Sequence, residues 1–531
     1  MSIEVYGAGA SGDATTTTSG ESFEVTGLFG GVEYQFSVAA RSSAGLGDRS
    51  EVVRVSTSSA KPDPPTATHQ TASSITLSWS APTVGTGEAS TGYQVYLVTV
   101  AAGTTEPVYT LVYDGAGSEA TSVELTSLDS GSLYTYVLSS LSAAGESDKS
   151  DAMSASTAPG VATGLSSTVQ TTGSIALAWT APTIPSGAAV TGYKVYSRVV
   201  HSQSSVSHVF AEAGVGADVV EHFLDPEDQS MVLDTLVYDG RNDVTTATDP
   251  STELNGLQGG SLYTYLVGAL SDAGESDRSA SLAVSTAAPA PTGLVSVSQT
   301  TTGMELSWTA PEVTSGEAVT GYKVYRDDGA GGAVDVVAYD SRENSGDFVS
   351  TSCSVSGLTG GLTYTYEVSA LSLAGESDRS SSMTSPTSPL QVSGVGSTSQ
   401  TTGSITLSWS APSATVGNEA SGYMVYHNDG VGGSEMSTVG YDGSSSTSTS
   451  GTITGLVGGR EYSFVVSALS HGGEGDVSDV LLQSTSPAAP TALASTVQTT
   501  TSISLSWTAP VTETGGAGVT GYVLYLSLIH I

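Results

Sequence analysis

The chain has 531 residues, of which 38% are hydrophobic and 12% are charged, and 52 Asp and Glu residues against 14 Lys and Arg residues give a formal net charge of −38. Such an acidic chain is not expected to bind nucleic acid or an anionic membrane surface, because both kinds of binding need clustered basic side chains. The single cysteine, Cys353, excludes an intrachain disulfide and any metal site built from several cysteines.

A repeat with a period of about 100 residues runs through the chain. Each copy contains a short run in which apolar and small polar residues alternate, and this run ends in a tryptophan that is closely followed by Ala-Pro. Period-two alternation predicts a strand with one buried face, and proline ends the strand because it has no N–H for pairing. The tryptophans are therefore expected core residues: Trp79, Trp179, Trp308, Trp409 and Trp507.

Two tyrosine-containing strands follow in each complete copy, for example at 93–96 and 134–138. A leucine lies six residues before the later tyrosine strand, and a turn that contains glycine lies between them in each copy. Short strands that are separated by turns, without a helical period, predict an all-β sandwich. The tyrosines that follow the leucines are also expected core residues: Tyr34, Tyr134, Tyr263, Tyr364 and Tyr462.

The recurring order of the Trp strand with Ala-Pro, the Tyr-x-Val-Tyr strand and the Leu/Tyr pair resembles that of fibronectin type III domains, and the resemblance covers nearly all of the chain. It implies tandem immunoglobulin-like β-sandwiches that follow one another like beads on a string. The Leu-to-Tyr spacing corresponds to a tyrosine corner, in which a buried ring keeps its hydroxyl bonded to nearby backbone. The resemblance also implies contact with proteins or carbohydrates and mechanical spacing.

Junctions rich in Pro, Ala and Thr predict the domain limits. Four complete domains are expected at 61–158, 159–288, 289–388 and 389–486, with partial domains at 1–60 and 487–531. The first partial domain lacks a Trp strand and the last stops before a tyrosine corner, so the chain is interpreted as a fragment. Residues 526–531 depart from the repeat pattern and are interpreted as a sequencing artefact. Any signal peptide, membrane span or catalytic domain would then lie in missing sequence.

The domain at 159–288 contains an insertion at about 198–234, which includes His201, His208 and His222 together with several acidic residues. Imidazole and carboxylate groups can hold Zn²⁺ or a similar ion. The separation of His201 and His208 is wider than in tight histidine pairs, so these three residues are weak candidates for a metal site. The favoured interpretation is a solvated surface loop with a short helical turn around 217–224.

Two kinds of loop are further candidates. Asp327-Asp328-Gly329, Asn428-Asp429-Gly430 and Asp114-Gly115 offer oxygen atoms that suit weak calcium binding, although such sequences are first of all turn signals. The loop after the tyrosine strand repeats as Ala-Gly-Glu-Ser-Asp, for example at 144–150. The same loop carries an integrin-binding Arg-Gly-Asp in some fibronectin-like domains, but this sequence contains no Arg-Gly-Asp. Near-identity between copies favours a turn that was copied with its domain.

No enzymatic activity is expected, because no histidine has a fixed place in the repeats and no nucleophile elbow or phosphate-binding loop is present. No cofactor is expected. The sequence predicts a spacer and a protein- or glycan-binding array from a larger cell-surface or secreted protein, with an unknown ligand. The alternative is the accessory repeat region of an enzyme or receptor whose catalytic domain lies outside this fragment. An intracellular scaffold also stays open, because the lack of disulfides suits either compartment.

Overall fold

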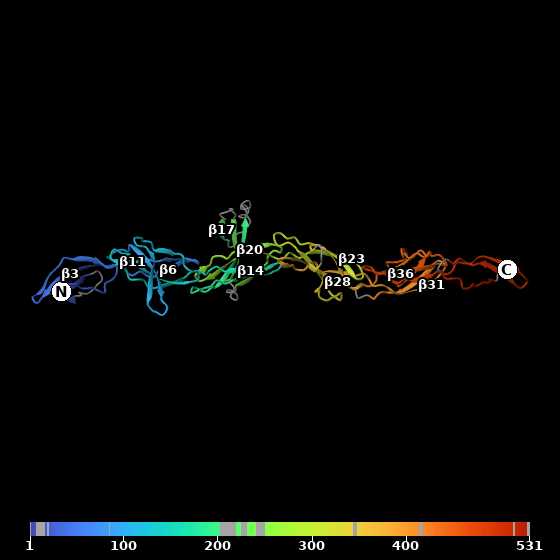
Figure 1. Cartoon of the computed structure of the whole chain (residues 1–531), viewed down its shortest axis with the longest axis horizontal. Coiled ribbons are helices and arrows are strands. Elements are labelled where there is room, and N and C mark those ends of the chain that lie inside the picture. The colour runs from blue at the N-terminus through green and yellow to red at the C-terminus, as the bar shows by residue number, and fades with distance from the viewer. Residues whose placement is uncertain are drawn as a thin grey trace. The chain divides into compact units, whose positions relative to one another are not determined.

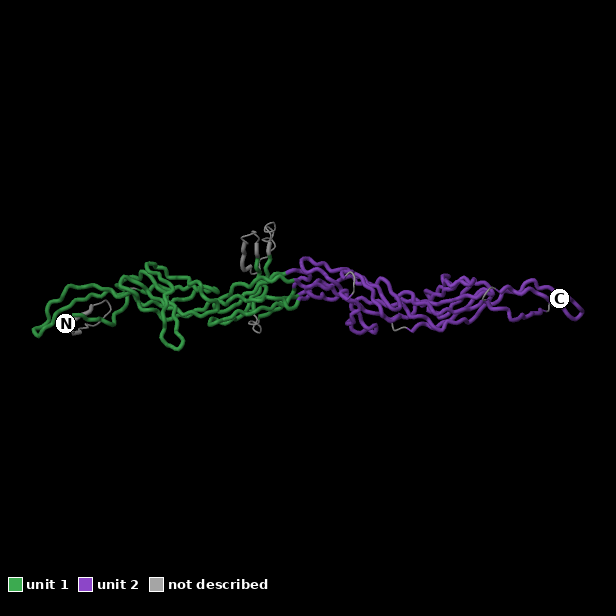
Figure 2. Tube along the Cα trace, in the orientation of Figure 1, with its two compact units in different colours: residues 1–169, 174–256, 263–284 green, residues 170–173, 257–262, 285–531 purple. Residues whose placement is uncertain are grey.

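The computed structural model describes residues 2–6, 16–17, 21–83, 85–201, 219–224, 231–240, 250–343, 348–413, 418–512 and 516–527. These residues form strands and one 3-10 helix, η3 (Ser341–Glu343), and they contain no α-helix. Two compact units are distinguished in Figure 2: unit 1 comprises 1–169, 174–256 and 263–284, and unit 2 comprises 170–173, 257–262 and 285–531. The protein is thus all-β throughout its described part.

The domain at 61–158 is a sandwich of two antiparallel sheets. One sheet has the order β10-β7-β6, and the other has the order β12-β11-β8-β9 with β13 also paired to β11; β6 and β11 mark the two sheets in Figure 1. The strands are β6 (Thr66–Gln70), β7 (Ile75–Ser78), β8 (Gly92–Val100), β9 (Pro107–Asp114), β10 (Ser122–Leu125), β11 (Leu133–Ser142), β12 (Gly145–Glu146) and β13 (Met153–Ser156).

The domain at 159–288 has the same two sheets, but its second sheet gains a strand at the edge. The orders are β14-β15-β19 and β17-β18-β16-β20-β21, with β22 paired to β20. The strands are β14 (Thr163–Gln170), β15 (Ser174–Thr180), β16 (Gly192–His201), β17 (Val219–Leu224), β18 (Met231–Asp239), β19 (Ser251–Asn255), β20 (Leu262–Ser271), β21 (Gly274–Glu275) and β22 (Leu282–Ser285).

The two remaining complete domains lie in unit 2 and repeat this topology. The domain at 289–388 contains β23 (Thr292–Gln299), β24 (Gly303–Thr309), β25 (Gly321–Arg326), β26 (Val336–Asp340), β27 (Ser352–Ser356), β28 (Thr363–Ser372), β29 (Gly375–Glu376) and β30 (Met383–Pro386). The domain at 389–486 contains β31 (Ser393–Gln400), β32 (Ser404–Ser410), β33 (Gly422–His427), β34 (Thr438–Gly443), β35 (Ser450–Thr454), β36 (Glu461–Ser470), β37 (Gly473–Glu474) and β38 (Leu481–Ser484).

The two ends of the chain each form one sheet. Residues 1–60 contain β1 (Ser2–Tyr6), β2 (Thr16–Thr17), β3 (Glu33–Ser42), β4 (Gly45–Arg49) and β5 (Val53–Ser56). Residues 487–531 contain β39 (Thr491–Gln498) and β40 (Ile503–Thr508), which pair with each other. In the described part of 487–531, Tyr522 belongs to no strand, whereas its equivalents Tyr93 and Tyr322 lie in β8 and β25.

The core of each complete domain forms where the apolar faces of its two sheets meet. In β7, Ile75 and Leu77 are fully buried while Thr76 and Ser78 are only half-buried, as the period-two pattern requires. The four tryptophans of the complete domains are buried, and each packs against the tyrosine of the next strand, at 5.2 Å between ring centroids for Trp308 and Tyr322. Trp507 is only half-buried, since the described residues of 487–527 form a single sheet of two strands, β39 and β40.

The tyrosine corner is formed as its spacing predicts. The hydroxyl of Tyr34 accepts the backbone N–H of Phe29 at 2.8 Å, and Tyr134 accepts that of Asp129 at 2.7 Å. The N–H groups of Thr359 and Val457 are bound in the same way by the tyrosines five residues later, at 3.0 and 2.9 Å. The rings of Tyr34, Tyr364 and Tyr462 are buried, so this bond satisfies a hydroxyl that water cannot reach freely. Tyr134 and Tyr263, which were also expected in the core, are only half-buried.

Candidate functional site

The loop after each tyrosine strand is a tight hairpin, and its glycine is required by the backbone. In the domain at 289–388, β28 pairs with β29 through Leu371 and Glu376 and through Ser372 and Gly375. Gly375 has φ +121°, a conformation that residues with a Cβ rarely adopt. The repeated Ala-Gly-Glu sequence is therefore the sequence of a hairpin turn.

The glutamate of this loop folds back onto the sheet. The Glu376 carboxylate accepts hydrogen bonds from Ser369 Oγ at 2.6 Å and Tyr325 Oη at 2.5 Å, and it pairs with Lys323 Nζ at 3.1 Å. Burial alone would oppose ionisation, but these three donors hold the pKa of the Glu376 carboxyl below its ordinary value. Arg379 then covers the ring of Tyr325, with 3.7 Å between the guanidinium carbon and the ring centroid.

The two serines of the loop satisfy backbone donors of the neighbouring strand. Ser377 Oγ accepts the N–H of Ala370 at 2.9 Å, and Ser380 Oγ accepts the N–H of Val368 at 3.1 Å. Both acceptors lie where β28 has no strand partner for these groups, and leaving them unpaired would be costly. The same pattern occurs in the domain at 61–158 with Ser147 and Ser150. Packing and hydrogen bonding thus account for the near-identity of the loops.

Loops at the ends of successive domains also contact each other within each unit. In unit 2, Thr301 Oγ1 donates to Asp476 Oδ2 at 2.6 Å, and the buried Asn418 donates through Nδ2 to the carbonyl of Thr387 at 2.8 Å. In unit 1, the carbonyl of Gly131 accepts the N–H of Gly187 at 2.8 Å. The hairpin loop at 374–380, a candidate for adhesion, contacts the preceding domain through the N–H of Asp378, which donates to Thr172 Oγ1 at 3.0 Å.

The acidic turns use their carboxylates to bind their own backbone. Asp328 Oδ1 accepts N–H bonds from Ala330 at 2.8 Å and Gly332 at 3.2 Å, and these bonds keep the pKa of Asp328 below its ordinary value. Asp429 Oδ1 accepts the N–H of Val431 at 2.9 Å in the next domain. Within the described residues, no group of three or more His, Cys, Asp or Glu side chains is placed to hold a metal ion. The structure shows these sequences as turns, and calcium binding by them stays a prediction.

The insertion in the domain at 159–288 extends the sheet, and the expected helical turn around 217–224 is wrong. β17 (Val219–Leu224) pairs antiparallel with β18, so the β-branched and aromatic residues there adopt the extended structure that they favour. His201 lies in β16 and His222 in β17, but their side chains, like the whole of His208, fall outside the described residues.

A buried ionic cluster stands at the base of the insertion, and it was not found from the sequence. Asp234 is 1% exposed and accepts two bonds from Arg198, at 2.7 and 2.8 Å, and one from Arg278 at 2.5 Å. Burial opposes the charge, but the two guanidinium groups keep the pKa of Asp234 below its ordinary value. Arg278 also lies over the ring of Tyr196 at 3.9 Å. The only sequence signal was that Asp234 and the two arginines lie near the ends of the insertion and of the hairpin loop.

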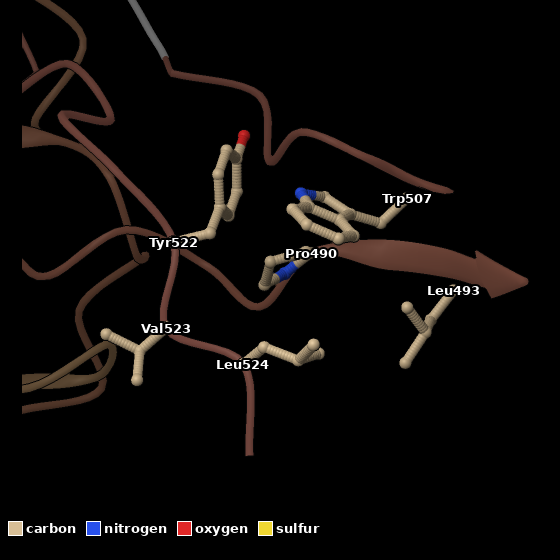
Figure 3. Close-up of a pocket in the computed structure, with 6 residues that line it drawn as sticks. All are labelled: Pro490, Leu493, Trp507, Tyr522, Val523 and Leu524. Atoms are coloured by element: carbon tan, nitrogen blue, oxygen red, sulfur yellow. The ribbon is translucent and has the colours of Figure 1, made fainter. Parts of the chain in front are cut away.

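The single cysteine of the chain is a poor nucleophile. Cys353 is buried, and desolvation raises the pKa of its thiol to about 12, which opposes formation of a nucleophilic thiolate. Figure 3 shows an open apolar pocket beside Trp507 and Tyr522, lined also by Pro490, Leu493, Val523 and Leu524. This pocket is the inner face of one incomplete sheet. In the described residues, no helix is long and apolar enough to cross a membrane.

Comparison with known proteins agrees with the fold. The chain is 32% identical over 282 residues to Exoglucanase B of Cellulomonas fimi, covering 49% of this chain and 23% of that protein. It is 39% identical over 149 residues to Chitinase A1 of Niallia circulans, covering 26% and 19%. It is 26% identical over 512 residues to human receptor-type tyrosine-protein phosphatase H, covering 87% and 42%. The chain spans less than half the length of each of these relatives.

Two solved structures are also similar to parts of the chain. The chicken CNTN1 FN1–FN3 domains give a TM-score of 0.24 at 15% identity, covering 62% of this chain and 99% of that one. A two-domain segment of chicken tenascin gives 0.20 at 21% identity, covering 37% and 99%. The fibronectin type III domain model matches residues 60–156, 158–285, 289–386 and 389–483. The chain therefore belongs to the fibronectin type III family, as a tandem array of four such domains.

Proposed function

We propose that this chain is a non-catalytic spacer in a larger secreted or cell-surface protein. The observation that carries the proposal is the contact between the end loops of successive domains, exemplified by Thr301 with Asp476 and by Asn418 with the Thr387 carbonyl. Loops that are held in this way fix the separation of neighbouring domains instead of presenting a free binding surface. Proline in the junctions, such as Pro389, restricts the backbone further.

The proposal predicts that length is the property that matters. Removing residues 289–388 should shorten the maximum dimension measured by small-angle scattering by about 30–35 Å, the length of strands of seven to nine residues with their loops. A matched variant, with Thr301→Ala, Asn418→Ala and Asp476→Ala in the full chain, should keep every domain folded and broaden the distribution of distances. Unchanged scattering in both variants would contradict a spacer.

A second candidate is supported by two of the relatives. Exoglucanase B and Chitinase A1 bear names of polysaccharide-degrading enzymes, and the aligned part covers no more than 23% of either protein. The chain would then be the accessory array of such an enzyme, with the catalytic domain elsewhere. Sedimentation of the chain with insoluble glucan or chitin tests this: retention on either polymer favours a glycan-binding accessory array, and recovery in the supernatant favours the spacer. Binding to a protein ligand would be a separate role, and its partner is unassigned.

A further inference from the structure

The strand β9 is an unusually exposed sheet edge. It ends the order β12-β11-β8-β9, and among the described residues no strand pairs with its outer side. Its side chains are mostly apolar, yet Val108 is 51% exposed, Tyr109 46%, Leu111 43% and Val112 40%. A row of unpaired N–H and C=O groups flanked by exposed apolar side chains is a template for another strand.

The equivalent edges in the other complete domains are covered or short. In the domain at 159–288, β17 pairs antiparallel with β18 and occupies this edge. In the domain at 289–388, β26 has 5 residues, and in the domain at 389–486, β34 has 6 residues, two of them glycines. By contrast, β9 has 8 residues and contains no glycine. Short strands and covering segments are two ways in which proteins protect such edges, and β9 has neither, although it begins at Pro107 and its register with β8 shifts between Tyr113 and Leu111.

The charge of the hairpin favours an occupant of the same composition. From Leu97 to the end of β9 the sequence contains two charged residues, Glu106 and Asp114, one at each side of the apolar stretch 107–113, although the chain as a whole carries −38. Lys149 lies nearby, with its ammonium 5.6 Å from the centroid of the Tyr109 ring. Two copies of this hairpin can therefore meet without the repulsion that opposes contact elsewhere on the surface. A strongly basic partner is not favoured, because the hairpin offers few acidic side chains for ion pairs.

We infer that β9 pairs antiparallel with β9 of a second copy of this chain, about a two-fold axis at Thr110, so that Thr110 faces Thr110 of the second copy. An antiparallel strand is self-complementary under such an axis, so one surface supplies both sides. Val108 and Thr110 alternate with Tyr109 and Leu111, so each face of the joined sheet would gain apolar cross-strand contacts. The pairing of β17 with β18 is the intrachain counterpart of the same arrangement. The inference is independent of the spacer proposal.

The first test is the mass of the full chain by light scattering over a range of concentrations. The wild type should form a dimer, and Leu111→Lys should raise the dissociation constant at least ten-fold, because an edge lysine blocks strand addition. Val439→Lys places the same charge on β34 and should leave the dimer intact. Leu524→Lys is the control for the exposed apolar face of residues 487–531 and should also leave it intact.

The second test locates the axis. Thr110→Cys should form an interchain disulfide on oxidation, because paired residues near the axis bring their Cα atoms to about 5 Å. Cys353 is buried and does not compete, and Thr438→Cys on β34 should not crosslink. A monomeric wild type would overturn the inference and leave the edge to a strand of another protein. A dimer that survives Leu111→Lys but is lost in Leu524→Lys would also overturn it.

Discussion

The domains at 289–388 and 389–486 share one topology and nearly one core, yet they differ at equivalent positions that are buried or hydrogen-bonded, and three of these are informative. Asp327 corresponds to Asn428, Tyr366 to Phe464, and Arg379 to Val477. In each pair one domain satisfies the local chemistry better than the other. The comparison shows that the repeated framework tolerates local mismatches, and it makes each domain a natural control for its neighbour.

The largest effect tests what the two domains have in common. Trp308 and Trp409 are each 5% exposed and pack against the tyrosine of the next strand. Replacing either tryptophan by alanine should lower the free energy of unfolding of its own domain by about 3–5 kcal/mol. Chemical denaturation that resolves the separate domains measures this.

The matched control for the tryptophan variants is Val337→Ala, since Val337 is half-exposed on the surface. It should change stability by less than about 0.5 kcal/mol. The neighbouring domain should lose only the loop contact made by Thr301 and Asp476. Simultaneous unfolding of both domains in Trp308→Ala would show that the two are one cooperative unit, and the comparison would then lose its basis.

The second effect comes from the buried turn that precedes the acidic loop residues. Asp327 Oδ1 accepts the N–H groups of Gly329 and Thr365, each at 3.1 Å. Asn428 makes the same two bonds through Oδ1, and its Nδ2 also donates to the carbonyl of Gly433 at 2.8 Å. Asn428→Asp should cost about 1–3 kcal/mol, because it removes the donor and buries a charge.

The reverse change, Asp327→Asn, should raise the free energy of unfolding by about 1 kcal/mol through the recovered hydrogen bond. Urea denaturation of the two variants measures both changes in the free energy of unfolding. If Asn428→Asp unfolds at the same urea concentration as the wild type, then the buried amide has no advantage over a carboxylate, and the comparison fails at this position.

The third effect concerns a hydroxyl without a partner. Tyr366 is fully buried, burial raises the pKa of its phenol, and its hydroxyl has no hydrogen-bond partner among the described residues. Phe464 occupies the equivalent position and is equally buried. Tyr366→Phe should therefore stabilise its domain by about 1 kcal/mol, and Phe464→Tyr should destabilise its domain by a similar amount. Thermal unfolding of the two variants measures these changes. If both substitutions lower the unfolding temperature, the unpaired hydroxyl of Tyr366 is not destabilising.

The smallest effect concerns the side chain that covers Tyr325. Arg379 lies 3.7 Å from the ring centroid and is also 3.4 Å from the Glu367 carboxylate, whereas Val477 at the equivalent position is 46% exposed. Arg379→Val should cost about 0.5–1 kcal/mol. Val477→Arg would place a guanidinium over the ring of Tyr426, and it should raise the free energy of unfolding by no more than about 1 kcal/mol. A double-mutant cycle with Tyr325→Leu separates the ring contact from the surface ion pairs, and zero coupling would refute it.

Most of the fold could be predicted from the sequence, because repetition makes a weak local signal strong. Trp79 and Tyr134 stand in patterns that recur several times, and their alternation reports which face of a strand is buried. The extra strand β17 could not be predicted, because its pairing depends on the free edge of β18 and the local sequence suits a helix or a strand. The Asp234 cluster was equally hidden, since its partners Arg198 and Arg278 come together only across the sheet.

The loop contacts are a case in which the pattern was visible but its meaning was not. Repetition of Ala-Gly-Glu-Ser-Asp showed that the loop matters, but it could not distinguish a ligand-binding loop from a structural one. The difference lies in long-range partners, such as Tyr325 for Glu376 and Thr301 for Asp476. These partners belong to other strands and, for Asp476, to another domain, so no local spacing identifies them.

The contact of Thr301 with Asp476 has a consequence for how such an array can grow. One half of the joint lies in the turn before the tryptophan strand, and the other half lies in a hairpin loop of the following domain. The acidic half has an equivalent in every complete domain, and the sequence Gln-Thr-Thr recurs at 170–172, 299–301, 400–402 and 498–500, whereas the domain at 61–158 has Ala72 at the position of Thr301. Duplication or deletion of an in-phase segment of the gene therefore rejoins matching halves wherever the domain before the new boundary carries Gln-Thr-Thr. Unequal recombination can thus change the number of domains in one step, with no new interface to evolve.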